Sequence, residues 1–246
     1  MRFISWVATT ALASAALAQP SPAPKAPVDQ LIPWLLNEDQ QLRGVPFSEL
    51  IFDTTGRKVL SFEANNAVDQ RVAKAACGET MKRLNAPNSE IQNVDRINEV
   101  SSHFEDTLHE LLSATPGLKC DFPLTAEGKL LRSGYPDLRI TDLESKRVFY
   151  LDPKLYAAGS RDSSFRTFYF EPKKSTNKVR DDAVHFVVGF EHAPRETASG
   201  SPKATWNFTR WDLVDLSRFT VKLKAEFQGS NRDMYRPEAI VASSAK

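Results

Sequence analysis

The sequence is poor in glycine and cysteine, and it has no excess of charge of either sign. Its 246 residues include ten glycines and two cysteines, and the formal net charge is +1. The low glycine content excludes a collagen-like chain, and 41% hydrophobic residues exclude a disordered one. The balanced charge excludes a strongly basic protein that coats nucleic acid. The chain is long enough to bury a substantial hydrophobic core.

Several enzyme motifs are also absent. The chain contains no GxSxG, no Walker loop and no GxGxxG, so it lacks the signatures of serine hydrolases, P-loop proteins and dinucleotide-binding domains. Its histidines show no HxxxH or HxH spacing, which argues against a zinc site. They are His103, His109, His185 and His192. We expect His185, in an apolar predicted strand, to be a core residue.

Only one long apolar run is present, at residues 3–17, so a polytopic membrane protein is excluded. The run follows Met1 and Arg2 and ends at the small-x-small sequence Ala16-Leu17-Ala18. This pattern predicts a cleavable secretory signal peptide over residues 1–18. A membrane anchor is the alternative, but the run is short for a span. We therefore expect a secreted or periplasmic protein without membrane attachment after cleavage. Its oligomeric state is left open.

Export influences how the remaining sequence is interpreted. In an oxidising compartment Cys77 and Cys120 are expected to form a disulfide, which would close a 44-residue loop and contribute about 4 kcal/mol. The alternative is a catalytic thiol, although neither cysteine lies in a His-paired motif. Asn207 begins a glycosylation sequon, which matters only in a eukaryotic secretory pathway.

The hydrophobic pattern predicts a mixed α/β (α+β) domain after a Pro/Ala-rich linker. The linker is placed at 19–30 and a single domain at 31–246. Helices are expected at 68–84 and from Asn88 or Ser89 to about Ser113. A hairpin is expected at 47–62, and strands at 135–141, 147–156, 165–171, 183–192 and 219–228. Charge is uneven, because residues 129–180 hold 12 basic and 6 acidic side chains.

That basic segment suits a polyanionic partner such as nucleic acid. The alternative is a solvated surface, especially at Lys173, Lys174, Lys178 and Arg180. Three aromatic residues beside Arg210 could stack on bases or pack in the core instead. They are Trp206, Phe208 and Trp211.

One constellation points to a specific chemistry. Pro136-Asp137 is followed after fourteen residues by Asp152-Pro153-Lys154. In an extended strand Asp152 and Lys154 point to the same face. A short polar turn joins the strands that carry the two aspartates, so an antiparallel hairpin would bring Asp137 near Asp152. This spacing resembles the PD-(D/E)xK nuclease superfamily.

The resemblance covers residues 89–192 and implies a restriction endonuclease-like core, with a central mixed β-sheet flanked by helices. It implies that Asp137 and Asp152 hold Mg²⁺, with Mn²⁺ as a substitute, and that Lys154 orients the attacking water. The Pro153 carbonyl is a further potential ligand. Many members add an acid from the preceding helix, and Glu105 lies at the edge of the predicted buried arc. Glu105 could equally be a surface residue.

The leading hypothesis is therefore an exported, Mg²⁺-dependent phosphodiesterase that cleaves DNA, or alternatively RNA, with metal-activated water. The competing hypothesis is a non-catalytic exported α/β domain that binds a partner through a basic and aromatic surface. In that case Asp137 would cap a turn, and Asp152 and Lys154 would be exposed on an edge strand. Pro153 favours an edge, since it removes a ladder hydrogen bond, and a central strand would require a bulge there.

Overall fold

The structure is a computed structural model that describes residues 27–36, 44–164, 168–197, 204–224 and 228–242. The chain divides into two compact units, Leu42–Leu223 and Met1–Gln41 with Lys224–Lys246. The second unit contains α1 (Pro27–Leu36), α6 (Asn231–Met234) and a 3-10 helix at Pro237–Ala239. α1 begins within the predicted linker. The predicted signal peptide lies outside the described residues and stays a prediction.

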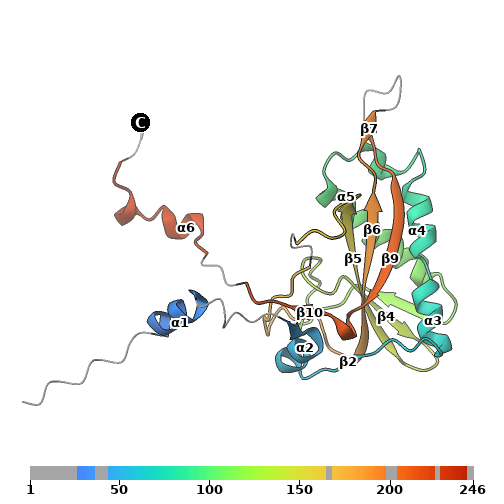
Figure 1. Cartoon of the computed structure of the whole chain (residues 1–246), viewed down its shortest axis with the longest axis horizontal. Coiled ribbons are helices and arrows are strands. Elements are labelled where there is room, and N and C mark those ends of the chain that lie inside the picture. The colour runs from blue at the N-terminus through green and yellow to red at the C-terminus, as the bar shows by residue number, and fades with distance from the viewer. Residues whose placement is uncertain (1–26, 37–43, 165–167, 198–203, 225–227, 243–246) are drawn as a thin grey trace, which may run out of the picture. The chain divides into compact units, whose positions relative to one another are not determined.

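The larger unit is built on a six-stranded mixed sheet (Figure 1). Strands β3, β4 and β5 form an antiparallel meander, and β6 runs parallel to β5. Both β2 and β9 pair with the other edge of β6, β2 in parallel and β9 antiparallel. The strands are β2 (Val59–Leu60), β3 (Leu118–Asp121), β4 (Leu138–Asp142), β5 (Val148–Ala157), β6 (Ala183–His192) and β9 (Phe208–Asp215). Two short pairs join β1 (Val45–Pro46) to β10 (Thr220–Val221) and β7 (Glu196–Thr197) to β8 (Ala204–Thr205).

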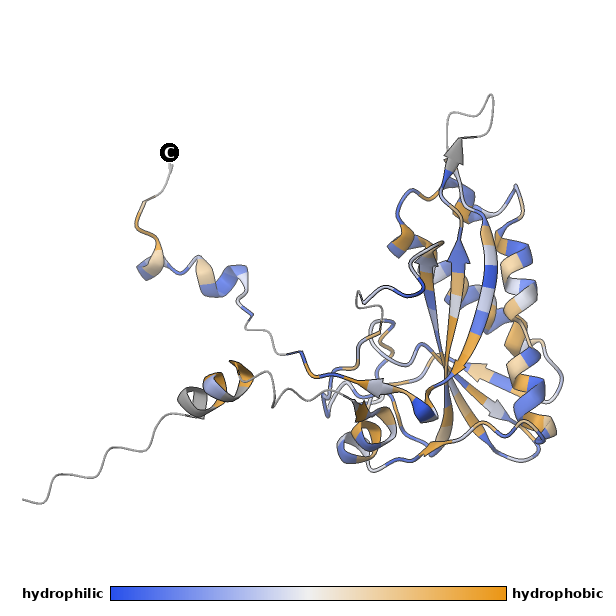
Figure 2. Cartoon of the chain, viewed as in Figure 1, coloured by the Kyte–Doolittle hydropathy of each residue, from blue (hydrophilic) through white to orange (hydrophobic). Residues whose placement is uncertain are grey.

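Helices flank the sheet because successive side chains of each strand point to opposite faces, and both faces are apolar. Hydrophobic bands follow the strands in Figure 2. α3 (Ala67–Lys74), α4 (Cys77–Leu84) and α5 (Ile97–Ser113) pack on one face, and α2 (Phe47–Thr55) contributes to the core of the other. α5 buries every fourth residue, namely Val100, Phe104, Leu108 and Leu112. This mixed sheet with flanking helices confirms the predicted fold class and is compatible with a restriction endonuclease-like core. Among the described residues, none of the helices is long and apolar enough to cross a bilayer.

The hairpin predicted at 47–62 is wrong, because its first half is helix α2. Phe47 and Ile51 lie one helical turn apart and are fully buried, so the helix packs one apolar stripe into the core. The hydroxyl of Thr55 donates to the Ile51 carbonyl at 2.7 Å. Gly56 then ends the helix in the left-handed region, with φ 69°. The Thr-Thr-Gly sequence is a helix end rather than a hairpin turn.

The single helix predicted at 68–84 is two helices, α3 and α4. Asn66 caps α3 by accepting hydrogen bonds from Val68 and Asp69. Ala76, with φ 70°, separates α3 from α4. Val72 and Cys77 would point about 140° apart on one straight helix, and the break allows both to enter the same core cluster. The next helix, α5, begins at Ile97 instead of 88–89, after a 3-10 helix at Glu90–Asn93.

Strand predictions succeed best in the centre of the sheet. The range 183–192 is confirmed as β6, and 147–156 matches β5 within one residue at each end. No strand forms at 168–171, and 165–167 lie outside the described residues. The range 219–228 contains only the two-residue β10, with 225–227 outside the description. Strand β9 was not predicted, and its Phe208 is buried in the core beside Trp206.

The predicted disulfide is wrong. Cys77, on α4, and Cys120, on β3, are both free thiols. Each is buried in the same hydrophobic cluster on the α5 face of the sheet. Burial raises the pKa of both thiols to about 12, so they behave as small apolar core residues and not as nucleophiles.

Candidate active site

The β4–β5 hairpin places two aspartates opposite each other. Leu138 pairs with Leu151 at the open end of the ladder, so Asp137, one residue earlier, faces Asp152. The turn at the other end fixes this register, because Asp142 Oδ1 accepts hydrogen bonds from the backbone N–H and the hydroxyl of Ser145, at 2.7 and 2.8 Å. The hairpin therefore brings together the two aspartates that the sequence motif singled out.

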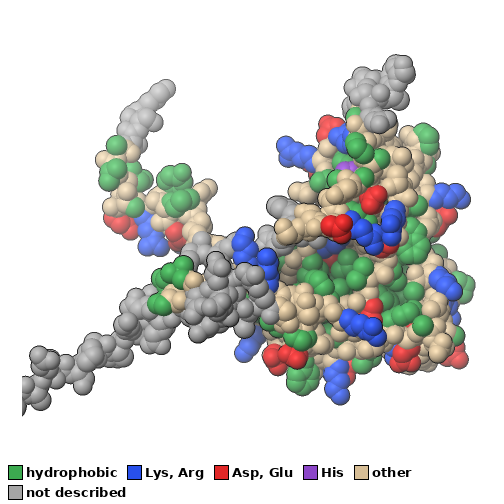
Figure 3. Space-filling model, viewed as in Figure 1, with side chains coloured by type: hydrophobic (Ala, Val, Ile, Leu, Met, Phe, Trp, Pro, Cys, Tyr) green, Lys and Arg blue, Asp and Glu red, His purple; other side chains and the backbone are tan. Residues whose placement is uncertain are grey.

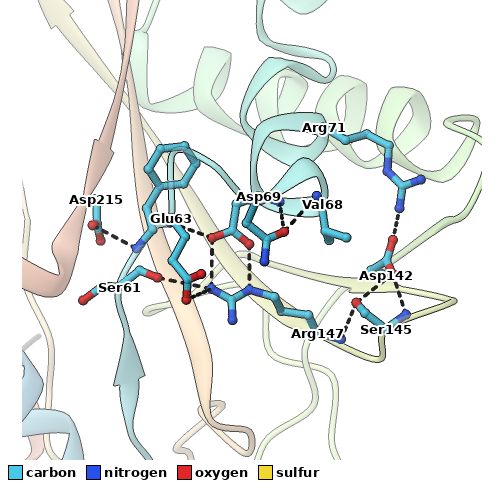
Figure 4. A network of polar contacts seen from close by, with 11 residues as sticks. Ser61, Glu63, Val68, Asp69, Arg71, Asp142, Ser145, Arg147 and Asp215 are labelled. Carbon is cyan, nitrogen blue, oxygen red and sulfur yellow. Dashed lines mark hydrogen bonds and ion pairs between the residues drawn. The ribbon is translucent and has the colours of Figure 1, made fainter.

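A separate polar network holds the hairpin against α3 (Figure 4). The Arg147 guanidinium donates to both carboxylate oxygens of Asp69, at 2.6 and 2.9 Å, and Asp69 is fully buried. Arg71, also on α3, forms an ion pair with buried Asp142. These contacts tie both sides of the hairpin turn to one helix, so they position the strands that carry the aspartates.

Asp152 and Lys154 point to the face of β5 opposite α5, as the strand phase predicts. Lys154 Nζ forms an ion pair with Asp152 Oδ2. Asp152 is only 2% exposed, so this ion pair supplies the positive charge that its buried Oδ2 needs.

Asp137 is held where ionisation is unfavourable. Burial raises the pKa of Asp137 to about 9, with further contributions from the charges of Asp152 and Glu105, while Lys154 acts in the opposite direction. The negative charge of an ionised Asp137 carboxylate is therefore poorly compensated by its surroundings.

Glu105, on helix α5, is close enough for its charge to contribute to the raised pKa of Asp137. Its side chain is 14% exposed, and its Oε2 accepts from Arg132 Nη2 at 2.8 Å. Arg132 also bridges to Asp106 at 2.8 Å. Glu105 is therefore a held, largely buried acid and not a free surface residue. We refer to Asp137, Asp152 and Glu105 as the acidic centre.

Pro153 lies in an internal strand without a bulge. The β4 ladder ends at Leu151, so the β4 side of β5 is open beside Pro153. On the other side the parallel ladder continues through the pair Pro153–Val188 in unbroken register. Neither the expected bulge nor the exposed edge strand of the competing hypothesis is found, since Asp152 is buried.

Sequence reasoning missed Lys178 as a residue of the site. It was grouped with solvated surface residues, but it is 2% exposed. Its Nζ donates to the Leu131 carbonyl at 3.3 Å. Burial lowers its pKa, while the charges of Asp137, Asp152 and Glu105 act to raise it. The only local signal is that the apolar residue Val179 follows Lys178, and this is too weak to identify a buried lysine.

A cavity of about 640 Å³ opens beside Lys178. Four basic side chains line it from β3, β4 and the segment before β6, namely Lys119, Arg139, Lys178 and Arg180. Arg139 is fixed there by Asp181, with two 2.8 Å hydrogen bonds. On the face seen in Figure 3, Lys and Arg side chains are dispersed among acidic ones. Part of the predicted basic segment thus gathers around this cavity.

His185 lies in the core beneath the acidic centre. Its Nδ1 is 2.7 Å from the Tyr135 hydroxyl, and both residues are buried. Burial lowers the pKa of His185 to about 3. The ring is therefore neutral at physiological pH and packs against Phe47 and Tyr150, as expected for a core histidine.

The donor set fits a hard divalent cation. Mg²⁺ is typically held by one or two carboxylates and keeps several waters, and Asp137 and Asp152 supply two carboxylates at one point. Within the described ranges no group of three or more His, Cys, Asp or Glu side chains is arranged to hold a metal.

Comparison with known proteins agrees with this chemistry. Residues 40–238 match the profile of the Type II restriction enzyme MjaV family. The Type II restriction enzyme MjaV of Methanocaldococcus jannaschii is 28% identical over 217 residues, which cover 82% of this chain and 90% of that protein. No solved structure matches. The matched range contains the acidic centre together with Lys154 and Lys178.

Proposed function

The chain belongs to the Type II restriction enzyme MjaV family, and from this premise we propose that it is a metal-dependent endonuclease that hydrolyses DNA phosphodiester bonds. The observation that carries the proposal is the facing pair Asp137 and Asp152, with Lys154 ion-paired to Asp152 on an internal strand. A structural ion pair alone would not need a second buried carboxylate beside it, since that carboxylate raises the cost of burial.

Each side chain has a role that follows from its surroundings. We assign Asp137 and Asp152 as ligands of Mg²⁺ or Mn²⁺. When bound, such a cation acts as a Lewis acid toward the phosphate and lowers the pKa of water. Lys154 Nζ lies at the same carboxylate, where it can donate a hydrogen bond to the water or to a phosphate oxygen. Glu105 adds negative charge and is held in place by Arg132.

DNA is favoured over RNA as the substrate by the name of the matched relative. The basic side chains around the cavity beside Lys178 support a path for the phosphate backbone. The competing proposal of a binding domain without activity has less support, because it requires an exposed Asp152 and the structure buries this residue.

The test is cleavage of plasmid and genomic DNA by the full chain with Mg²⁺, Mn²⁺ or EDTA. Asp152→Asn keeps the shape of the side chain and removes its charge. We expect it to lower the cleavage rate by about 100-fold or more. Exposed Glu144→Gln, in the hairpin turn, is the matched control and should cleave like the wild type.

Three results would count against the proposal. Cleavage that persists in EDTA would exclude the metal-dependent mechanism. Full activity of Asp152→Asn would mean that the active site lies elsewhere. A folded protein that binds DNA but cleaves none with either metal would favour the binding-domain alternative.

A further inference from the structure

Residues 178–181 form a wall of the basic cavity that is anchored to the sheet. The Tyr150 hydroxyl, on β5, donates to Asp181 at 2.8 Å and accepts from the Arg180 backbone N–H at 2.9 Å. Asp181 in turn holds the guanidinium of Arg139, on β4, with two 2.8 Å hydrogen bonds. Because Tyr150 is fully buried, this wall is fixed in position relative to β4 and β5.

Two cations of this wall, Lys178 and Arg180, reach across to the connection between β3 and β4. Lys178 Nζ donates to the Leu131 carbonyl at 3.3 Å, and Arg180 Nη1 donates to the Thr125 carbonyl at 3.4 Å. Both contacts are long and go to neutral groups. The nearby acids Asp181 and Glu171 form ion pairs with other cations, and within the described ranges no carboxylate pairs with Lys178 or Arg180.

The remaining charges of the cavity wall compensate each other. Lys119 pairs with Asp121 at 2.8 Å, and Arg139 pairs with Asp181. Lys178 and Arg180 line the same cavity and carry the charge that is not balanced there. Lys178 is also 2% exposed, and a lysine is almost never buried to this extent unless an anion accompanies it. The cavity is therefore suited to an anionic ligand.

The size and lining of the cavity indicate what kind of anion it fits. Its volume of about 640 Å³ lies within the usual range of sites for small organic groups. Leu124 and Leu130 line it with apolar surface, and they are 50% and 60% exposed. Arg139, which also lines it, follows Asp137 by two residues, a step of about 7 Å along an extended strand. A phosphate with an attached sugar matches this combination of charge, apolar surface and place.

We propose that Lys178 and Arg180 clamp one phosphate of the bound DNA strand, beside the phosphate at the acidic centre, with the attached deoxyribose against Leu124 and Leu130. The guanidinium supplies donors in a planar fork, and the ammonium supplies a compact charge, which together suit a phosphodiester. This inference rests on the proposed function and deepens it, because it names residues that hold the substrate strand.

The experiment measures binding of a short, fluorescein-labelled DNA duplex of mixed sequence to the full chain in EDTA. Fluorescence anisotropy gives the affinity from about 50 to 200 mM NaCl. Arg180→Gln removes a charge at an exposed position, and Lys178→Met removes the buried charge. Arg83→Gln is the matched control, because Arg83 lies on α4, across the sheet from the cavity, and is held by Glu79 and Glu110.

We expect Arg180→Gln and Lys178→Met each to bind DNA about tenfold more weakly than the wild type at the lowest salt concentration. Arg83→Gln should bind like the wild type. Unchanged affinity of Arg180→Gln would overturn the proposal, since a contact that only supports the fold would alter the thermal midpoint and not DNA binding. Because Arg180 is exposed, this variant decides the test even where Lys178→Met does not fold.

The double variant tests whether both side chains bind the same phosphate. Loss of one phosphate contact should reduce the slope of log affinity against log salt by about one. The double variant should therefore show a reduction of about one. A reduction of about two would mean that Lys178 and Arg180 bind separate phosphates, and it would overturn the clamp.

A further titration distinguishes the DNA strand from a free phosphate compound as the source of the phosphate. The full chain is titrated with thymidine monophosphate and with inorganic phosphate by isothermal titration calorimetry. We expect neither to bind with a Kd below about 1 mM, because a single phosphate provides little of the binding energy. Micromolar binding of either compound that Arg180→Gln abolishes would assign the cavity to a free ligand and overturn the proposal.

None of these measurements involves cleavage, so the two proposals can fail separately. A protein that cleaves no DNA but loses DNA affinity in Arg180→Gln would refute the nuclease function alone. Metal-dependent cleavage, with DNA affinity unchanged in Arg180→Gln, would refute only the phosphate clamp.

Discussion

At the scale of single residues, Asp137 is held in an environment that opposes its charge. Its pKa is raised to about 9 by burial and by the neighbouring carboxylates, whereas an unfolded aspartate titrates near 4. Between these values the folded protein binds more protons than the unfolded chain, so this group makes unfolding easier as pH rises. In the metal-free protein Asp137 therefore lowers stability above about pH 4.

Asp137→Asn should separate stability from activity. In EDTA at pH 8 we expect its free energy of unfolding to exceed that of the wild type by about 1–3 kcal/mol, because the amide is neutral in the buried site without having to take up a proton on folding. Its DNA cleavage should be lost. Urea denaturation from pH 5 to 9 measures this difference, with exposed Asp53→Asn as the control. A loss of stability at pH 8 would show that the carboxylate is better compensated than we infer.

His185 produces the opposite pH dependence. Its pKa falls to about 3 in the folded protein through burial, so below about pH 6.5 the unfolded chain binds a proton that the folded protein does not. We expect stability to decrease as pH falls from about 6.5 towards 3, by at most about 1.4 kcal/mol per pH unit from this group. The free energy of unfolding of His185→Gln should therefore decrease less steeply with falling pH than that of His109→Gln, the control at a half-buried position. Equal slopes would contradict this account.

At the scale of secondary-structure elements, the hairpin that carries the aspartates depends on α3. Asp69 is fully buried and binds Arg147 through both carboxylate oxygens, and it accepts a hydrogen bond from the Glu63 backbone. Asp69→Ala leaves the guanidinium without its partner, and we expect a loss of about 3 kcal/mol in urea denaturation. A cost below about 0.5 kcal/mol would show that the network is dispensable.

The elements that sequence reasoning found are those whose pattern is set by local burial. β6 is mostly apolar because both faces of this central strand are covered, and α5 has a regular four-residue stripe. α2 was missed because Phe47 and Ile51 also fit a strand of mixed residues. The break at Ala76 and the pairing of β9 with β6 depend on tertiary packing, which no local pattern encodes.

At the scale of the whole molecule, the candidate site was predictable only in part. Asp137, Asp152 and Lys154 lie on two strands joined by a short turn, so spacing and strand phase were enough to place them together. Lys178 follows Lys154 by 24 residues and lies beside the basic cavity, in a segment without regular structure. Its burial is a property of the folded chain and left almost no trace in the sequence.

The cysteines provide a test of the fold as a whole. Cys77 and Cys120 belong to elements on opposite sides of α5 in the sequence, and both are buried in one core as free thiols with a pKa of about 12. A thiol reagent such as DTNB should therefore label neither residue in the native protein, and both should react at the rate of global unfolding in urea.

Because no disulfide constrains the chain, dithiothreitol should leave the thermal midpoint unchanged, with the Cys77→Ala, Cys120→Ala variant as the reagent blank. A lower midpoint in dithiothreitol, or two fewer titratable thiols in denaturant without reductant, would mean that the cysteines are joined after all.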